Sequence, residues 1–145
     1  MHKNYIVPLD CHALLQKKNL NVCSLEDSIK QNIHLILYTK FGEFRYDLSF
    51  GCEIWDKNFE NIHSVSKWKD SISDSILVSI RDNEIRLSDI KINVLLKDSK
   101  NQDHDTHMSG KYRMRIIIKI AGIINETNQV FQHWENIFFS PLSMI

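Results

Sequence analysis

The sequence predicts an α+β fold in which N-terminal helices pack on a small C-terminal antiparallel sheet. In the first half of the chain, apolar residues recur at spacings of three and four, which is the period of an amphipathic helix. Beyond Arg86 they alternate with polar residues, which is the period of a strand with one buried face. Because the helices precede the strands and do not alternate with them, the α+β class is favoured.

The length and composition are those of a single globular domain. With 145 residues, of which 43% are hydrophobic and 25% charged, the chain can bury roughly 68–70% of its unfolded surface. The formal net charge is +0, so we expect neither nucleic-acid binding nor direct membrane insertion. No apolar run of signal-peptide length follows the first residues, which favours a cytoplasmic protein.

Residues 1–23 are expected to form an N-terminal arm, and residues 24–145 a single domain. The stretch 5–9 is extended in character, and Asp10 is the expected N-cap of a short helix that runs through Leu14 and Leu15 to Lys18. Such an arm can dock on the chain's own core or on a neighbouring subunit. Docking on its own core is the simpler expectation.

The first long helix is predicted to start at Ser24 and to stop near residues 40–42. Its apolar positions share one face: Leu25, Ile29, Ile33, Ile36 and Leu37. Ser24 followed by Asp27 has the form of an N-terminal capping box. Gly42 is expected to take the left-handed C-cap conformation, and Lys40 suits the negative end of the helix dipole.

The remaining elements follow from spacing. A second main helix is predicted over residues 67–81, where Trp68, Ile72, Ile76 and Ile80 repeat at every fourth position, and it should lie against the first helix. Strands are predicted at residues 90–96, 112–121 and 130–139, separated by a polar loop at 98–110 and a turn at 125–128.

The loop between the first helix and the rest of the chain has an unusual content. Between Gly42 and Gly51, four apolar residues alternate with polar ones: Phe44, Tyr46, Leu48 and Phe50. We expect an extended loop held by its aromatic side chains, although alternation alone would also suit a short strand. The residues Leu37, Thr39, Gly42, Glu43, Arg45, Phe50, Gly51 and Cys52 resemble the segment after the first long helix in the baseplate wedge family of contractile phage tails and type VI secretion systems. In this chain Phe44 separates the glutamate from the arginine, which is a small departure.

A second part of the resemblance lies just after the second predicted helix, in the sequence Asn-Glu-Ile-Arg-Leu. The wedge family carries Glu-Pro-Arg at this junction and places it at contacts with neighbouring wedge subunits. Glu84, Arg86 and Leu87 match that motif, while Ile85 replaces the proline. The resemblance therefore implies that these three residues bind a partner. The alternative is an ordinary surface ion pair that stabilises the fold by under about 1 kcal/mol.

The resemblance extends over residues 5–143 and is strongest to TssE-type wedge proteins of type VI secretion baseplates. It implies a non-enzymatic, cofactor-free structural subunit that bridges other wedge proteins, of the TssF and TssG type, and the first ring of sheath subunits. Arg113, Arg115 and Lys119 form a basic stripe on one face of the second predicted strand, which is expected to be a protein-contact face or a solvent-exposed face. As a contact face, it could steer an acidic partner segment into register. An open edge of the small sheet is expected to accept a strand from a sheath subunit. The alternative is that the chain's own N-terminal arm or its tail, residues 138–145, covers both edges.

Two other function classes remain as alternatives. Wedge proteins of this family have often been labelled lysozyme-like, but nothing in the spacing of the available carboxylates builds a sugar cleft: Glu43, Asp47, Asp56 and Glu60. The other alternative is a binding module with an unrelated partner. No catalytic residue is assigned, since the chain has no nucleophile elbow and no phosphate-binding glycine loop.

No metal site is assigned either. His104 and His107, with Asp103 and Asp105, have ligand-like spacing but lack a second cluster to complete a tetrahedral site. The three cysteines have no C-x-x-C spacing, and we expect them to be small buried hydrophobic residues: Cys11, Cys23 and Cys52.

Overall fold

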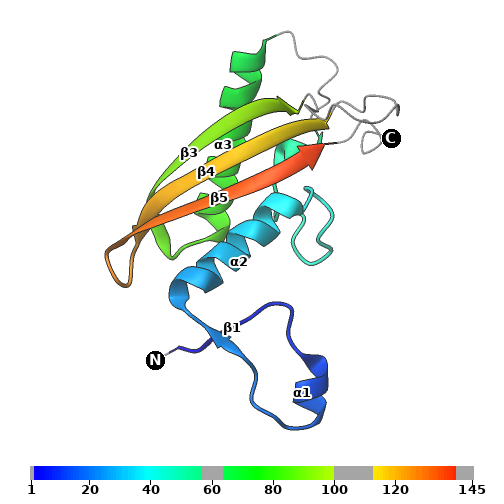
Figure 1. Cartoon of the computed structure of the whole chain (residues 1–145), viewed down its shortest axis with the longest axis vertical. Coiled ribbons are helices and arrows are strands. Elements are labelled where there is room, and N and C mark those ends of the chain that lie inside the picture. Colours follow the sequence, from blue (N-terminus) through cyan, green and yellow to red (C-terminus); the bar gives the residue numbers. More distant parts are fainter. Residues whose placement is uncertain (1, 57–63, 100–112, 140–145) are drawn as a thin grey trace, which may run out of the picture.

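The computed structural model describes residues 2–56, 64–99 and 113–139, and it confirms the α+β class (Figure 1). A two-stranded ribbon and a short helix come first: β1 (Asn4–Tyr5), α1 (Cys11–Leu15) and β2 (Val22–Cys23). The main helices are α2 (Leu25–Tyr38) and α3 (Val65–Asn83), with the 3-10 helix η1 (Glu53–Asp56) between them. Three long strands follow: β3 (Leu87–Ser99), β4 (Arg113–Ile124) and β5 (Gln129–Phe139).

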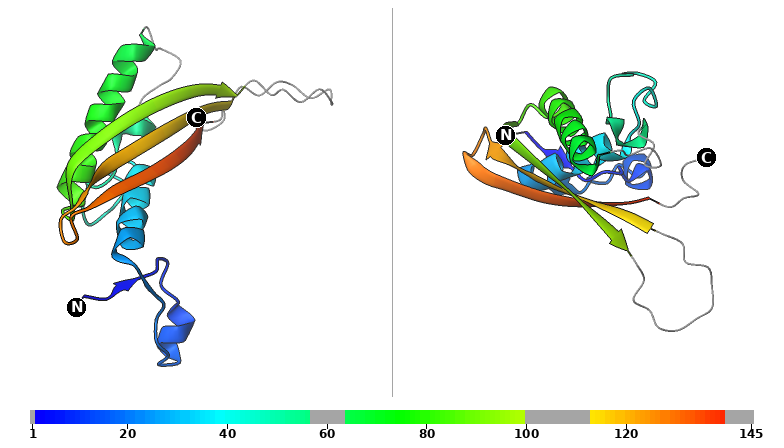
Figure 2. Two further views of the ribbon diagram at one scale, coloured as in Figure 1. Left: turned by 60° about the vertical axis from the view of Figure 1, so that its left-hand side comes forward. Right: turned by 90° about the horizontal axis from the view of Figure 1, so that it is seen from above.

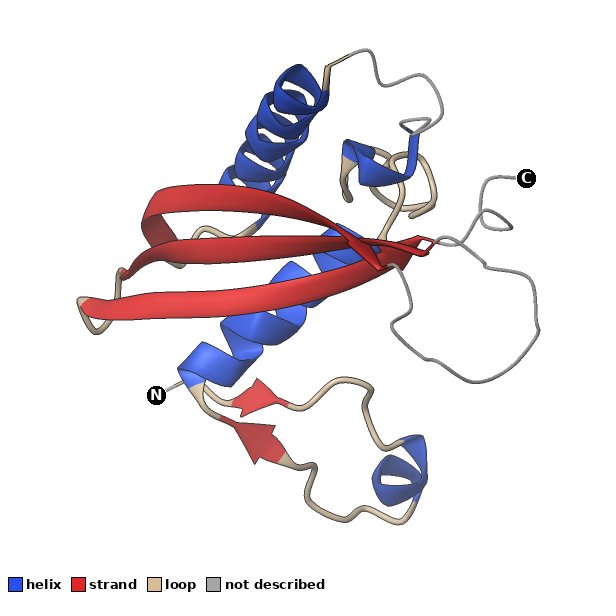
Figure 3. Cartoon of the chain, turned by 45° about the horizontal axis from the view of Figure 1, so that its top comes forward, coloured by secondary structure: helices blue, strands red, loops and turns tan. Residues whose placement is uncertain are grey.

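The three long strands form an antiparallel sheet in the order β3-β4-β5, so β4 lies in the centre. Both main helices lie on the same face of this sheet, α3 beside β3 and α2 beside β5 (Figures 2 and 3). The two helices also contact one another, as predicted. On the opposite face, no helix or strand of the described residues covers the sheet.

The core lies between the helices and the sheet and is rich in isoleucine. The buried side chains that line it from the helices and from the sheet include Ile29, Ile33, Ile36, Leu37, Ile72, Ile76, Ile80, Ile116, Ile118, Ile120, Phe131 and Ile137. Full burial of one such side chain contributes about 1.5–3 kcal/mol relative to exposure. The predicted helical and alternating periods are therefore confirmed by burial on these faces.

Helix α2 starts as predicted but ends earlier. Ser24 Oγ accepts a hydrogen bond from the Asp27 N–H at 3.0 Å, as in a capping box. The helix stops at Tyr38, because Thr39 is extended and its carbonyl accepts the Cys52 N–H at 3.0 Å. The prediction that Gly42 caps the helix was wrong, since this pairing of distant segments overrides local propensity. Gly42 does have a positive φ of 80°, but it lies in the turn that follows the helix and not at the helix end.

The N-terminal arm, residues 2–23, extends away from the sheet beyond the start of α2 (Figure 1). Asp10 caps α1 as predicted, and its Oδ1 accepts the Ala13 N–H at 3.0 Å, but the helix ends at Leu15 and does not reach Lys18. The Val7 N–H donates to Gln31 Oε1 of α2 at 2.5 Å. None of the arm's described side chains is buried, so the expected docking on the chain's own core is wrong. The reason is that the arm pairs with itself through β1 and β2.

The strands are longer than their patterns predicted. The central residues of each strand are those that the sequence predicted. The turn that joins β4 to β5 falls at residues 125–128, as expected, with Asn128 at a positive φ of 55°. The start of the predicted 98–110 loop belongs to β3, and the rest of that loop lies outside the described residues. His104 and His107, whose spacing is like that of metal ligands, also lie outside them.

Candidate partner-binding site

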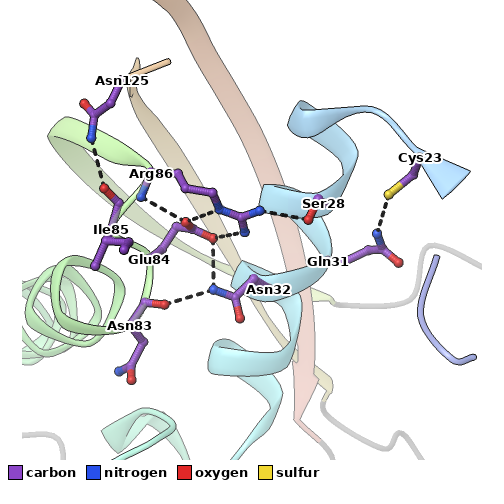
Figure 4. Close-up of polar contacts among 9 residues, drawn as sticks. All are labelled: Cys23, Ser28, Gln31, Asn32, Asn83, Glu84, Ile85, Arg86 and Asn125. Carbon is purple, nitrogen blue, oxygen red and sulfur yellow. Dashed lines mark hydrogen bonds and ion pairs between the residues drawn. The ribbon is translucent and has the colours of Figure 1, made fainter. Parts of the chain in front are cut away.

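The junction between α3 and β3 holds the predicted Glu-Ile-Arg-Leu motif, of which Figure 4 shows Glu84, Ile85 and Arg86. Glu84 is the C-cap of α3, and its N–H donates to the Ile80 carbonyl at 2.7 Å. Leu87 begins β3 and is only 6% exposed, so its side chain belongs to the core and has little surface to offer a partner. The motif therefore turns the chain from helix to sheet.

Glu84 is 1% exposed, and side chains from α2 and from the α3–β3 turn bind its carboxylate. Arg86 forms a bidentate pair with it, with Nε 2.7 Å from Oε1 and NH2 2.6 Å from Oε2. Asn32 of α2 donates to Oε2 at 2.9 Å, and Arg86 NH1 donates to Ser28 Oγ at 2.9 Å. The hydrogen bond to Glu84 raises the pKa of Arg86, so this arginine stays charged.

The alternative of an ordinary surface ion pair is wrong, because the Glu84 side chain is only 1% exposed. The charged groups tie α2 to the α3–β3 junction inside one chain. The sequence could not predict these contacts, because no local pattern shows that Asn32 lies beside Glu84 or that Ser28 lies beside Arg86. Ile85, in contrast, is 82% exposed, and the Arg86 side chain is 32% exposed. Partner binding by this junction stays a prediction, and these two residues are the ones that a partner could reach.

The turn lacks the proline of the wedge family, and a neighbouring loop holds it instead. Asn125, at the β4–β5 turn, donates from Nδ2 to the Ile85 carbonyl at 2.9 Å, and its N–H donates to the Arg86 carbonyl at 2.9 Å. Sequence reasoning identified residue 125 only as part of a turn. Its contact with the motif depends on the register of the sheet, which brings Leu87 opposite Ile124.

Part of the predicted basic stripe lies on the face of β4 that is turned away from the helices. Arg115 and Lys119 share that face, away from the buried Ile116 and Ile118. Arg115 donates from Nε and NH2 to Asn136 Oδ1 at 3.2 and 2.8 Å. The side chain of Arg113, the first residue of β4, lies outside the description, so the predicted role of the three residues in partner binding stays a prediction.

The predicted structural loop is a series of turns. It is a loop and not a strand, as expected, but it is compact and not extended, because the Gly42 N–H donates to the Leu48 carbonyl at 3.0 Å. Phe44 meets Phe50 edge-on, with ring centroids 5.7 Å apart. A Cβ at Gly51, whose φ is 121°, would lie 2.5 Å from the Thr39 carbonyl oxygen, so only glycine fits.

The charged residues of this loop have different surroundings. Glu43 accepts the Lys40 N–H at 2.9 Å, and Arg45 is exposed. Hydrogen bonds from Ser49 lower the pKa of Asp47, and Asp56 lies 2.8 Å from the Lys40 ammonium. These carboxylates are thus engaged in local structure.

A second glutamate, which the sequence did not single out, joins α2 to β5. Glu135 Oε1 lies 2.8 Å from His133 Nε2 and 3.1 Å from His34 Nδ1. Burial acts to raise the pKa of Glu135, but the two histidine contacts outweigh it and lower the pKa overall. Beside it, burial and the Glu135 charge raise the pKa of Tyr38, whose hydroxyl donates to the Asn136 carbonyl at 3.1 Å.

Neither a metal-ligand cluster nor a membrane-spanning helix is found in the part of the chain that the structure describes. Within residues 2–56, 64–99 and 113–139, no group of three or more His, Cys, Asp or Glu side chains could hold a metal ion. Among the same residues, no helix is long and apolar enough to span a membrane.

Burial raises the pKa of the Cys52 thiol to about 11, in line with its predicted role in the core. Cys11 is exposed and Cys23 is half-buried, so that prediction was wrong for Cys11.

The family model of the baseplate wedge protein gp25 matches residues 23–129, which is well over half of the chain. The chain belongs to the gp25 baseplate wedge family. The resemblance predicted from the sequence is confirmed at this level. The match contains the helix α2, the Glu84–Arg86 junction and the first two long strands, and it begins where the predicted arm ends.

Two solved structures resemble this gp25-family chain. One is a candidate tail lysozyme from Geobacter sulfurreducens, with 23% identity and a TM-score of 0.57 over 83% of this chain and 96% of that chain. At this level of identity the likeness shows the fold alone. The other belongs to the baseplate complex from the type VI secretion system, with 13% identity and a TM-score of 0.47 over 78% of this chain and 90% of that chain. No curated protein matches the chain.

Proposed function

We propose that this chain is a non-enzymatic structural subunit of a type VI secretion baseplate, a contractile injection machine, where it bridges wedge subunits and the first sheath ring. The observation that carries the proposal is a small sheet whose two edges have no strand partner among the described residues, in a chain of the gp25 wedge family. The TssE-like sequence motifs support the assignment to a secretion system. Such a role places the protein in the cytoplasm, with no cofactor.

The sheath contact is assigned to the edges of the sheet. Among the described residues, β3 and β5 each pair only with β4, so each presents an edge of backbone groups without a strand partner. One backbone carbonyl in each edge strand accepts a hydrogen bond from a side chain. Ser73 donates to the Ile92 carbonyl of β3, and Tyr38 donates to the Asn136 carbonyl of β5. Exposed edges of this length bind an added strand through main-chain hydrogen bonds.

Hydrogen exchange tests this contact directly. Amide exchange would be measured with and without purified sheath subunits, and with an unrelated soluble protein as the control. New protection is expected in β5 or β3, because an added strand takes up their unpaired N–H groups. Protection confined to α2 and α3 would contradict the proposal.

The wedge contact is assigned to the exposed tip of the α3–β3 junction. Ile85 is 82% exposed and stands next to the half-buried Arg86, so an apolar side chain is offered to water beside a charge. The variant Ile85→Asp should spare the melting temperature but impair copurification with TssF- and TssG-type partners. The matched control is Val78→Asp on α3, where another exposed apolar residue lies away from the junction. Equal loss of copurification in both variants, or in neither, would overturn this assignment.

The alternative function is peptidoglycan cleavage, which requires two carboxylates placed across a sugar cleft. Against it, the Glu43 side chain accepts a main-chain hydrogen bond and Asp56 pairs with Lys40. Glu60 lies outside the described residues. The test is incubation with labelled peptidoglycan beside the double variant Glu43→Gln, Glu60→Gln. No turnover is expected, and turnover that the double variant abolishes would refute the non-enzymatic role.

A further inference from the structure

The face of the sheet turned away from the helices, here called the outer face, has its own chemistry. The strand registers place three rows of side chains across it: Lys97, Arg115 and Phe138; Leu95, Ile117 and Asn136; and Asn93, Lys119 and Trp134. A fourth row contains Lys91, Ala121 and Gln132. Because side chains alternate between the faces of a strand, none of these residues belongs to the buried isoleucine face.

The outer face is positively charged although the chain is neutral overall. Four of its residues are cations, Lys91, Lys97, Arg115 and Lys119, and the four rows contain no carboxylate. None of the four cations forms an ion pair within the part of the chain that the structure describes. The formal charge of +0 is therefore unevenly distributed, and this face has a positive field that attracts anions.

Large apolar side chains lie among these cations. Trp134 and Phe138 are each 61% exposed, and the Arg115 guanidinium carbon lies 5.6 Å from the centroid of the Phe138 ring. An open hollow of about 430 Å³ lies at the middle of the sheet, with Lys91, Lys119 and Trp134 among its lining residues. Exposed aromatic residues beside a hollow are typical of binding surfaces for other macromolecules.

We propose that the outer face binds an acidic, amphipathic segment of a partner protein. Carboxylates of that segment would pair with Arg115 and Lys119, and an apolar side chain would fill the hollow beside Trp134. Charge complementarity selects this occupant, because the face supplies cations and exposed apolar area together. The inference goes beyond the proposed function, which concerns the edges of the sheet and not its outer face.

Two other occupants fit these observations less well. A second copy of the chain, docked by the same face, would bring two positive surfaces together. A nucleic acid could use the cations and stack bases on the exposed aromatic rings, but it would leave the aliphatic side chains of Leu95 and Ile117 at the centre of the face without an apolar partner. An acidic protein segment uses the cations and the aliphatic centre at once.

The test uses the full chain and a synthetic peptide that alternates glutamate with leucine. Binding would be followed by NMR chemical-shift changes of the backbone amides, with a peptide in which glutamine replaces glutamate as the first control. Shift changes are expected over β4 and β5 around Lys119 and Trp134, and affinity should fall as salt is raised. Changes confined to other elements, or equal affinity for the glutamine peptide, would overturn the proposal.

Charge-reversal variants sharpen the test. Lys91→Glu combined with Lys119→Glu should weaken binding of the acidic peptide by at least about tenfold, because attraction becomes repulsion. The matched control is Lys67→Glu with Lys69→Glu on α3, which changes the net charge equally but leaves the outer face intact. Equal weakening by both pairs, or tighter binding of a single-stranded oligonucleotide than of the peptide, would contradict the inference. Unchanged sheath-dependent protection of the edges in Lys91→Glu, Lys119→Glu would show that the two surfaces act separately, as proposed.

Discussion

Two glutamates hold opposite sides of α2 in different ways. Glu84 joins residues of α2 to the α3–β3 junction, and its partner is the arginine Arg86. Glu135 joins α2 to β5, and its partners are the histidines His34 and His133. Arginine keeps its charge at all ordinary pH values. The contacts at Glu135, in contrast, lower the pKa of that carboxyl, so their contribution is lost in acid.

The degree of burial separates the two sites as well. Glu84 is 1% exposed and all its partners are within hydrogen-bond distance, while the Glu135 side chain is 13% exposed. Breaking a buried ion pair leaves a charge without a partner and without water, which costs more than the pair itself contributes. The difference teaches that two glutamates in contact with the same helix can contribute very different free energies to the fold.

The largest effect is expected for Glu84→Ala. Loss of the carboxylate leaves Arg86 and Asn32 without their partner in a half-buried place, and the free energy of unfolding should fall by roughly 3–5 kcal/mol. Urea unfolding of purified protein measures it. The matched control, Glu26→Ala, removes an exposed glutamate from α2. A loss under about 1 kcal/mol for Glu84→Ala would show that Glu84 is not structural.

A smaller effect is expected for Glu135→Gln. This change removes the charge from the carboxyl that the histidines contact, and it should cost about 1.5–3 kcal/mol at neutral pH. Since the folded-state pKa of Glu135 lies below its ordinary value of 4.5, its contribution is present above pH 4.5 and is lost as pH falls through the lowered pKa. Unfolding curves of the two proteins at several pH values should therefore converge in acid. Curves that stay equally separated at all pH values would contradict this account.

Asn125→Ala should cost less again. It removes the Nδ2 hydrogen bond to the Ile85 carbonyl but keeps the main-chain contact with Arg86, so a loss of about 0.5–1.5 kcal/mol is expected. The comparison variant is Asn93→Ala on the exposed outer face, which should change the melting temperature little. If the two variants behave alike, Asn125 does not hold the turn that lacks proline.

The smallest effect concerns the exposed ion pair of Lys30 with Glu26, four residues apart on α2. The two charges lie 2.7 Å apart, but water screens them, so Lys30→Ala should cost only about 0.3–0.5 kcal/mol. High salt should remove the difference between this variant and the parent. A difference that survives high salt would mean that the Lys30 stem packs on the helix.

Much of the fold could be predicted from the sequence, because the signals involved are local. The capping residue Ser24 and the four-residue spacing of Ile72, Ile76 and Ile80 identified the two main helices. The alternation around Ile116 and Ile118 identified the central strand with its buried and exposed faces. In each case, residues within one or two turns of one another meet the same requirement, which is to bury one face.

The site was predictable only in part. The sequence identified Glu84 and Arg86 as a pair, and it placed Arg115 and Lys119 on one face of a strand. It did not predict that Glu84 would be buried, and it did not single out Glu135. Both glutamates owe their surroundings to α2, whose docking against the sheet no local pattern describes.

By itself, then, the sequence determined the helix starts, the strand faces and the resemblance to the wedge family. Only the tertiary structure decided where α2 ends and which residues surround each glutamate. Asn32 and Ser28 precede Glu84 and Arg86 by 52 and 58 residues, and His34 precedes Glu135 by 101. Caps and periods act over a few residues, but contacts over such separations form only when the helices pack on the finished sheet.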